Sequence, residues 1–190
     1  MDIAGVVLAA GAGRRYGMPK ALVAYRGGLL VQRAAATLAE AGCAPTVVVL
    51  GAEAARVRAA APGLEFVDNP DWATGMASSL RTGLAALRHG TAAAAVVLLV
   101  DMPGVTPAAV RRIAGHATAA DLAMGGYGER RGHPVLLGRD HWDGVAASAT
   151  GDRGARDYLR ANAGLLRVVP VDDIADDFDL DTPEQAARHA

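Results

Sequence analysis

The residues best suited to phosphate chemistry lie in a glycine-rich segment close to the N-terminus. Positions 8–20 read LAAGAGRRYGMPK and directly follow an apolar run at 3–8. Glycines let the backbone approach a phosphate closely, and their amides can form a nest that binds an anion. Arg15 and Lys20 carry positive charge that stabilises a triphosphate and the transition state of its transfer. The segment therefore predicts a phosphate-binding loop.

Two familiar phosphate-binding motifs do not match this segment. A Walker A loop needs Ser or Thr after its lysine, whereas Lys20 precedes Ala21. Gly11, Gly13 and Gly17 are one residue too widely spaced for the dinucleotide fingerprint, which disfavours an NAD-linked oxidoreductase. A plain connecting loop with solvated charges is the other alternative. Such a loop has little use for this many glycines and cations at the end of a strand.

Asp101 is the second candidate for chemistry, because it immediately follows the apolar run at 94–100. If the runs at 3–8 and 94–100 are strands of one parallel sheet, their carboxyl ends lie at the same edge. Asp101 then lies beside the phosphate-binding loop. Magnesium prefers one or two carboxylates together with phosphate oxygens and water. An aspartate that merely ends a strand in a turn is the alternative, and the adjacent loop favours the metal.

The elements that must position these groups follow an alternating pattern. Short apolar, β-branched runs alternate with helical stretches, which is typical of a parallel sheet with crossover helices. We predict strands at 3–8, 45–50, 64–68, 94–100, 131–137 and 165–170, and helices at 29–41, 52–61, 77–88, 107–117, 139–147, 152–162 and from 182 onward.

This pattern predicts an α/β fold: a single three-layer, Rossmann-like domain over residues 1–190 with a mostly parallel central sheet. We expect residues 1–105, which contain the phosphate-binding loop, to form the half that binds an NTP, and residues 106–190 to form the half that binds an acceptor. Two helix starts have clear capping chemistry. Thr106 precedes a proline at the first helical position, and Gln185 lies at the capping-box position after Thr182.

Composition narrows the function classes. The formal net charge of -1 argues against a general nucleic-acid binder. Cys43 is the sole cysteine, so a disulfide framework and a cysteine-based metal site are excluded. The start of the chain lacks the basic region of a signal peptide, and the apolar run at 92–100 is too short to span a bilayer. We expect a cytoplasmic protein that binds neither membrane nor nucleic acid.

The pattern L-A-A-G-x-G-x-R-x-G-x-P-K at 8–20 resembles the nucleotide-binding loop of the MobA/MocA-like nucleotidyltransferases. The resemblance implies the fold of the nucleotide-diphospho-sugar transferases and magnesium (Mg2+) bound to Asp101. It also implies an NTP held by the loop, with Arg15 and Lys20 on the phosphates and both serving catalysis together with Asp101. The loop residues implied as NTP contacts are Leu8, Ala9, Ala10, Gly11 and Gly13.

A second metal position is implied near the C-terminus. The segment 178–184 resembles the terminal motif of the same family, with two acids before T-P-E. If this segment is a strand, Asp179 and Asp181 share one face. Asp179 is the favoured ligand, and the alternative role for Asp181 is to support the following helix start.

Several segments resemble those of the MocA-like molybdenum cofactor cytidylyltransferases. In the segment 69–80, Gly75, Ser78 and Ser79 offer amides and hydroxyls suited to a base or ribose, with helix capping as the alternative for the serines. Ala10 makes the loop L-A-A-G, which this branch pairs with CTP, whereas GTP-using relatives have L-A-G-G. Met102 departs from the G-D-Q-P of the branch, which leaves the contacts at that position open.

The acceptor side is implied by two further segments. Residues 131–136 and 150–156 resemble acceptor-binding motifs of the same branch, and they contain His133, Arg153 and Arg156. His133 is suited to donate to an anionic acceptor, and the arginines are suited to grip a phosphate. A histidine in an ordinary loop and a solvated helix start are the alternatives.

The resemblance implies transfer of CMP from CTP to molybdenum-bound molybdopterin, which gives the cytosine dinucleotide and pyrophosphate. The product would then pass to a molybdoenzyme or its chaperone. Two enzymatic alternatives are a guanylyltransferase that uses GTP and transfer to another phosphorylated acceptor such as a sugar phosphate. An alternative of another class is a nucleotide-binding cofactor chaperone without catalysis, which the presence of both Lys20 and Asp101 disfavours.

Overall fold

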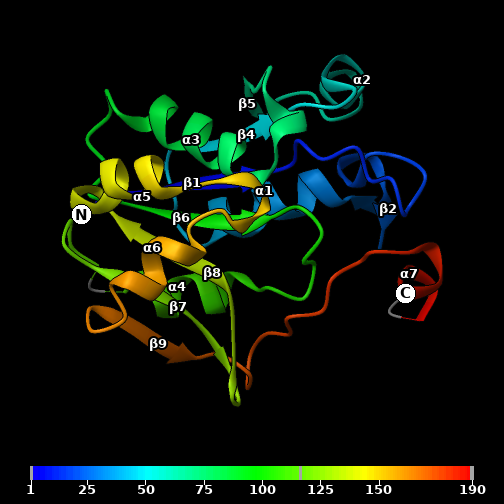
Figure 1. The fold of residues 1–190 in the computed structure, drawn as a ribbon. Helices are drawn as coiled ribbons and strands as arrows, with labels where there is room; N and C mark the ends of the chain where they lie inside the picture. The colour runs from blue at the N-terminus through cyan, green and yellow to red at the C-terminus, as the bar shows by residue number, and fades with distance from the viewer. Residues whose placement is uncertain (1, 116, 189–190) are drawn as a thin grey trace.

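The computed structural model describes residues 2–115 and 117–188 and contains a seven-stranded sheet in the order β5-β4-β1-β6-β8-β7-β9 (Figure 1). Its strands are β1 (Ile3–Leu8), β4 (Thr46–Leu50), β5 (Glu65–Asp68), β6 (Ala94–Leu99), β7 (Leu122–Tyr127), β8 (Arg130–Gly138) and β9 (Leu166–Pro170). All neighbours are parallel except β8, which is antiparallel to β6 and β7. A ribbon of β2 (Ala24–Tyr25) and β3 (Gly28–Leu29) follows the glycine-rich loop. The predicted α/β fold with a mostly parallel sheet is confirmed.

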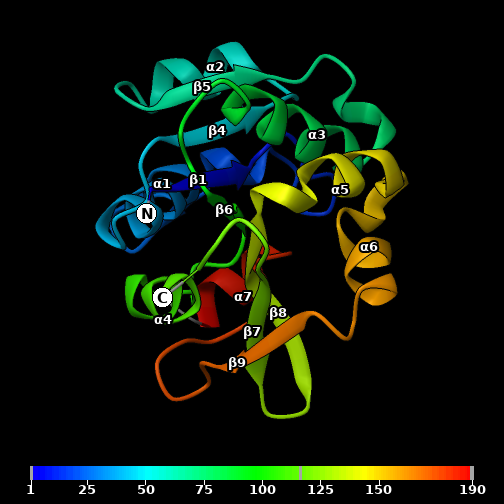
Figure 2. The same ribbon diagram turned by 90° about the vertical axis from the view of Figure 1, so that its left-hand side faces the viewer.

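Helices cover both faces of the sheet. They are α1 (Leu30–Glu40), α2 (Ala54–Ala60), α3 (Met76–Leu87), α4 (Pro107–Ala114), α5 (Trp142–Ser148), α6 (Arg156–Ala161) and α7 (Pro183–Arg188), with 3-10 turns η1 (Lys20–Leu22), η2 (Trp72–Thr74), η3 (Arg139–His141) and η4 (Gly151–Arg153). Figure 2 shows α1 and α4 on one side of the sheet and α3, α5 and α6 on the other. Among these described residues, no helix combines the length and the apolar character needed to cross a membrane.

The near-continuous apolar strands are explained by burial on both faces. Val7 of β1 belongs to the core with α1 and α4, whereas its neighbours Val6 and Leu8 belong to the core with α3, α5 and α6. Val6 and Val7 are both 0% exposed, as the alternation of side chains across a strand requires. Burial of each such side chain contributes about 1.5–3 kcal/mol, so the strands that carry the site are held firmly.

The second half of the chain differs from the prediction at one strand. No strand was predicted at 122–127, because Gly125 and Gly126 interrupt the apolar pattern, yet these residues form β7. Close packing explains both glycines: a Cβ on Gly125 would lie 3.0 Å from the His133 carbonyl oxygen, and one on Gly126 would lie 3.0 Å from a Val168 methyl group. Glycine here marks close approach of neighbouring strands and does not end the strand.

Two helices begin at their predicted capping residues, whereas three other predicted boundaries differ. The Thr106 hydroxyl accepts from the amide of Ala109 at 3.2 Å, and Gln185 Oε1 accepts from the amide of Thr182 at 3.0 Å. The helix predicted at 107–117 ends at Ala114, and residue 116 lies outside the described part of the chain. The helices predicted at 139–147 and 152–162 each begin with a 3-10 turn instead.

The topology brings three distant segments to one edge of the sheet. Leu8 of β1 pairs in register with Leu99 of β6, so the glycine-rich loop and Asp101 leave the sheet side by side. The segment before α7 joins them, because the amide of Leu180 donates to the carbonyl oxygen of Asp101 at 2.9 Å. Figure 1 shows the blue loop and the red C-terminal segment at the same end of the molecule.

Candidate active site

A network of two cations and two carboxylates lies at this edge. Lys20 Nζ donates to Asp101 Oδ2 at 2.6 Å and also to Asp181. Arg15 pairs with the second oxygen of Asp181 at 2.7 Å. The side chains of Lys20 and Asp101 are only 15% and 18% exposed, so water screens their interaction weakly. Residues that are 81 and 161 positions apart along the chain therefore form one ionic cluster.

The network changes the protonation of its members. Burial by itself lowers the pKa of Lys20, but hydrogen bonds to Asp101 and Asp181 outweigh it and raise the pKa above its ordinary value. The hydrogen bond from Lys20 in turn lowers the pKa of Asp181. Lys20 therefore stays cationic and Asp181 stays anionic near neutral pH.

Asp179 behaves in the opposite way. Burial, followed by repulsion from Asp101 and Asp181, raises the pKa of Asp179 to about 6. Residues 172–182 form no strand, so the condition for Asp179 and Asp181 to share a strand face is not met. Asp181 turns to Lys20 and Arg15, whereas Asp179 forms no ion pair with the residues that the structure describes and lies in the field of the other two carboxylates.

The donor set suits a divalent cation that arrives with phosphate. Within the described residues, no group of three or more His, Cys, Asp or Glu is arranged to hold a metal on its own. Asp101 and Asp179 nevertheless repel one another, and a cation between them would relieve that repulsion. Magnesium usually takes only one or two protein carboxylates and completes its shell with phosphate and water. The residues present therefore fit magnesium delivered with a nucleotide.

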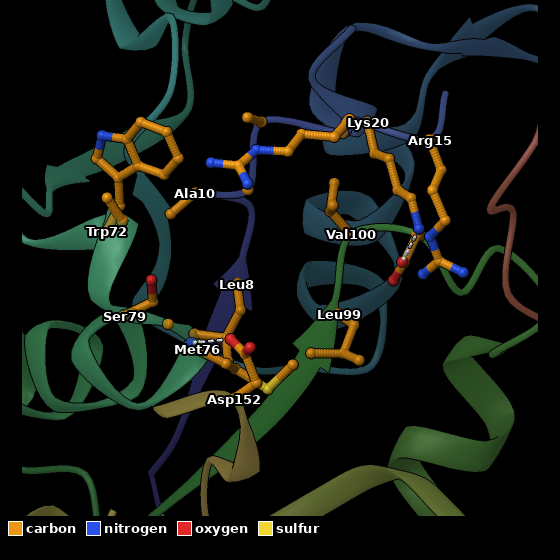
Figure 3. A pocket seen from close by; sticks show the side chains of 17 residues that line it. Leu8, Ala10, Arg15, Lys20, Trp72, Met76, Ser79, Leu99, Val100 and Asp152 are labelled. Carbon is orange, nitrogen blue, oxygen red and sulfur yellow. Dashed lines mark hydrogen bonds and ion pairs between the residues drawn. The ribbon is translucent and has the colours of Figure 1, made fainter. Parts of the chain in front are cut away.

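A cavity of about 420 Å³, here called the donor cavity, opens beside the glycine-rich loop. In Figure 3, Arg15 and Lys20 lie on one side, Trp72 and Ser79 on the other, and Ala10 between them. Its lining comprises Leu8, Ala10, Gly11, Ala12, Gly13, Arg14, Arg15, Lys20, Trp72, Ala73, Gly75, Met76, Ser79, Leu99, Val100, Asp101 and Asp152. The predicted NTP contacts therefore come together here, except for Ala9 and Ser78.

Ala9 and Ser78 have structural surroundings instead. Ala9 is 2% exposed and packs in the core on the α1 side. The Ser78 hydroxyl accepts from Asn69 Nδ2 at 2.8 Å and is 4% exposed. Asn69 also donates to Ser79 at 3.0 Å, so its buried amide links the segment after β5 to the first turn of α3. Of the two serines, only Ser79 lines the cavity.

A second cavity of about 520 Å³, here called the acceptor cavity, adjoins the first. The two share Leu8, Met76, Leu99 and Asp152 in their linings. The predicted acceptor residues His133, Arg153 and Arg156 all line the acceptor cavity, as do Met102, Met124, Arg131, Arg160, Asp177 and Asp179. Burial lowers the pKa of His133 to about 4, so its imidazole is neutral near neutral pH.

Of the residues that line the donor cavity without having been predicted as contacts, three have polar or aromatic side chains. Arg14 and Trp72 line the donor cavity, and Asp152 lines both cavities. Asp152 accepts from the amide of Met76 at 3.2 Å and so holds the start of α3, as Figure 3 shows. The two residues are 76 positions apart, and no local pattern announces this contact. Arg14 had a signal in the sequence, because it lies within the glycine-rich loop.

The sheet order, the glycine-rich loop and the paired cavities define an α/β protein of the nucleotidyltransferase type. Residues 5–167 match the family described as the MobA-like NTP transferase domain. The chain belongs to this family, and the resemblance predicted from the glycine-rich loop is confirmed.

Individual relatives carry different names. The chain is 39% identical to a nicotine blue oxidoreductase of Paenarthrobacter nicotinovorans, over 98% of this chain and 95% of that protein. It is 37% identical to a probable molybdenum cofactor guanylyltransferase of Opitutus terrae, over 56% of this chain and 51% of that one. The crystal structure of Rv0371C in complex with manganese, from Mycobacterium tuberculosis, has a TM-score of 0.82 at 32% identity and covers 100% of this chain and 98% of that one.

The Asp179→Asn variant, measured with a chelator present, is expected to melt at a higher temperature than the parent protein near pH 8. Above a pH of about 6 the parent carries a charge at Asp179 that its surroundings disfavour. As the pH falls through 6 toward the model-peptide value of 3.8, the folded state takes up a proton first and this penalty is lost. The difference between the two proteins should therefore shrink toward about pH 4.5. Since Asp179 is exposed to solvent, which screens this repulsion, we expect a shift of a few degrees at most.

Thermal unfolding followed by circular dichroism at both pH values measures this difference. Asp172→Asn removes an exposed acid from the same segment and serves as the control. A difference between Asp179→Asn and the parent that is the same at both pH values would contradict the raised pKa.

Proposed function

We propose that this protein is a magnesium-dependent nucleotidyltransferase that transfers CMP from CTP to a phosphorylated acceptor of the molybdopterin type and releases pyrophosphate. One observation carries the proposal. Asp101 lines the donor cavity and Asp179 lines the acceptor cavity, so two carboxylates flank the junction across which a nucleotidyl group would pass. Magnesium held by Asp101 and Asp179 would neutralise phosphate charge at that junction.

Residues of this chain bind the triphosphate and stabilise its charge during the transfer. Amides of the glycine-rich loop bind the triphosphate, while Arg15 and Lys20 stabilise the charge on its oxygens. Lys20 is already held by Asp101, so its ammonium needs little reorientation when the nucleotide binds. An anionic acceptor phosphate attacks the α-phosphorus in line, which forms a phosphoanhydride bond and expels pyrophosphate. No nucleophilic side chain is needed, because positioning and electrostatics provide the rate increase.

Two observations support the choice of nucleotide and metal. With the phosphates at Arg15 and Lys20, the base would extend past Ala10 toward Ser79 and Trp72, which lie on the far side of the donor cavity in Figure 3. The L-A-A-G sequence at this point favours CTP. The manganese complex of the relative from Mycobacterium tuberculosis supports a divalent cation.

The acceptor is proposed from a relative that matches only 56% of this chain. The relative from Opitutus terrae is named as a probable molybdenum cofactor guanylyltransferase, which supports an acceptor of the molybdopterin type. The name of this relative also supports GTP as the alternative nucleotide donor. Transfer of the finished cofactor to a molybdoenzyme or its chaperone belongs to the same proposal.

A second candidate function is an oxidoreductase. The observation in its favour is the 39% identity to a nicotine blue oxidoreductase over 98% of the chain. The glycine spacing at 11–17 counts against a standard dinucleotide fingerprint. Protection from heat unfolding separates the two functions: CTP with magnesium should protect a nucleotidyltransferase, whereas NADH or NADPH should protect an oxidoreductase. An oxidoreductase should also oxidise NADH or NADPH when a dye is present as the electron acceptor.

Pyrophosphate release from each of the four NTPs, with magnesium and molybdenum-loaded molybdopterin, tests the proposed reaction. We expect the rate of pyrophosphate release with CTP to exceed the rate with each of the other three nucleotides by at least about tenfold. Release with GTP alone would assign the protein to the guanylyl branch. Binding of CTP without release would move the search to other phosphorylated acceptors.

A further inference from the structure

The segment that joins β9 to α7 holds one carboxylate against the ionic cluster. This segment, residues 171–182, is here called the C-terminal strap, and it forms neither helix nor strand. Its backbone is tied to the loop after β6: the amide of Asp176 donates to the carbonyl oxygen of Gly104 at 3.0 Å, and that of Leu180 donates to Asp101. Leu180 is 0% exposed and packs in the core on the α1 side. The next residue of the strap is therefore fixed beside the cluster.

That residue, Asp181, does not use its carboxylate to start the helix that follows. The amides of Asp181 and Thr182 both donate to Gln185 Oε1, at 2.7 and 3.0 Å, and the Thr182 hydroxyl accepts from the amide of Gln185 at 3.4 Å. Both carboxylate oxygens of Asp181 face cations instead, one paired with Lys20 and the other with Arg15. The side chain therefore serves the ionic cluster and not α7.

The charges of the cluster cancel. Arg15 and Lys20 carry two positive charges, and Asp101 and Asp181 carry two negative charges, so the sum is zero. Two of the three donors of the Lys20 ammonium are already engaged by carboxylates. In Figure 3 the charged ends of Arg15 and Lys20 lie side by side, where one anion can bind both. In the protein without nucleotide, the cations that would bind a triphosphate are therefore neutralised from within.

The two carboxylates of the cluster differ in their position. Asp101 directly follows a buried strand and lines the donor cavity, whereas Asp181 lies on the irregular strap and is not part of the cavity lining. A carboxylate that accepts from an ammonium and a guanidinium group occupies the same kind of position as a phosphate oxygen. If Asp181 leaves while Asp101 stays, two cations and one carboxylate remain, and the net charge of +1 favours the phosphates.

We propose that Asp181 is an autoinhibitory carboxylate, which occupies Arg15 and Lys20 in the nucleotide-free protein and leaves them when the phosphates of a nucleotide bind. Its return after the transfer competes with pyrophosphate for the same two cations. Asp181 thus weakens the binding of the nucleotide and speeds the departure of the product. This inference rests on the proposed function, because that function assigns the phosphates to Arg15 and Lys20.

Binding of tripolyphosphate and of pyrophosphate to the full-length protein, measured by calorimetry with a chelator present, tests the competition without nucleoside or metal. We expect Asp181→Asn to bind both anions about five- to tenfold more tightly than the parent, since the amide keeps the size of the side chain and removes its charge. Asp181→Glu keeps the charge and should stay within about twofold of the parent. The control Asp172→Asn removes a charge that acts on Arg112, and it should also stay within about twofold.

A second background separates direct competition from a general effect of net charge. In Arg15→Gln the carboxylate can compete only at Lys20, so the gain from adding Asp181→Asn should fall to about twofold. A gain caused by the lower overall charge of the protein would be the same in both backgrounds. Thermal unfolding shows whether each variant is folded, and Lys20 keeps Asp101 as a partner when Asp181 is changed.

Hydrogen exchange of the parent protein tests the same displacement without any substitution. The amides of Asp176 and Leu180 are hydrogen-bonded to the loop after β6. Saturation with tripolyphosphate should speed their exchange by at least about threefold, because the strap loses its ionic contact with the glycine-rich loop. This measurement decides the question even if Asp181→Asn fails to fold.

Three outcomes would overturn the inference: tripolyphosphate binding by a folded Asp181→Asn protein that is no tighter than that of the parent, an equal gain in Asp172→Asn, or unchanged or slower exchange in the strap. Absence of tripolyphosphate binding in every variant would overturn it as well. Failure of the proposed function is distinguishable, because NTPs would then yield no pyrophosphate while Asp181→Asn still binds tripolyphosphate more tightly.

Discussion

Asp101→Asn is expected to lower the rate of pyrophosphate release by about three orders of magnitude or more while the protein remains folded. The substitution keeps the size of the side chain and removes the negative charge that faces Lys20 at 2.6 Å. Lys20 keeps Asp181 as a partner, so its ammonium group is not left unpaired. The proposed magnesium site loses its carboxylate on the donor side, which explains why the rate suffers far more than the fold.

Single-turnover pyrophosphate release and thermal unfolding together measure this effect. Asp173→Asn removes a carboxylate of an exposed ion pair with Arg112 and should leave the rate unchanged. An Asp101→Asn protein that turns over at the parent rate would remove Asp101 from the metal site. A protein that loses cooperative unfolding would show that the carboxylate is structural.

Gly13→Ala is expected to abolish nucleotide binding and to destabilise the protein by about 1–3 kcal/mol. Gly13 has a φ of +60°, and a Cβ there would lie 1.9 Å from the carbonyl oxygen of Met18. Because the clashing atom belongs to the backbone, the loop must change its course. The amides that would bind the triphosphate then lose their arrangement.

Gly11→Ala, in the same loop, tests ligand binding without an expected change in the stability of the fold. Its φ lies outside the left-handed region, and a Cβ there meets nothing within 4 Å. We expect unchanged stability but at least about tenfold weaker CTP binding, since a methyl group would intrude where the phosphates approach the backbone. Gly17→Ala is the matched control: its φ of +86° is strained, yet a Cβ there also meets nothing. It should lose about 1 kcal/mol of stability and retain most of its nucleotide affinity.

Calorimetric titration with CTP and magnesium, together with urea unfolding, distinguishes the three variants. Undiminished CTP binding by Gly11→Ala would contradict a phosphate close to that residue. Equal loss of binding in Gly13→Ala and Gly17→Ala would mean that backbone strain, and not the clash with Met18, accounts for the effect.

The sequence by itself determined the features that depend on local order along the chain. The apolar runs predicted six of the seven strands of the main sheet, because strands buried on both faces must be apolar throughout. Parallel pairing of β1 with β6 follows from that alternation with helices, and it is why Asp101 could be placed beside the glycine-rich loop. The caps at Thr106 and Gln185 were also predictable, since a cap involves residues only a few positions apart.

Only the tertiary structure decided which side chains meet across the sheet edge. It turns Asp181 to Lys20 and Arg15, leaves Asp179 facing other carboxylates, and ties Ser78 to Asn69 away from the donor cavity. It also brings Met102 and Arg131 to one acceptor cavity. Periodicity and capping act over a few residues, whereas these contacts join segments far apart in the sequence. Their partners are set by how the helices and the C-terminal segment pack on the finished sheet.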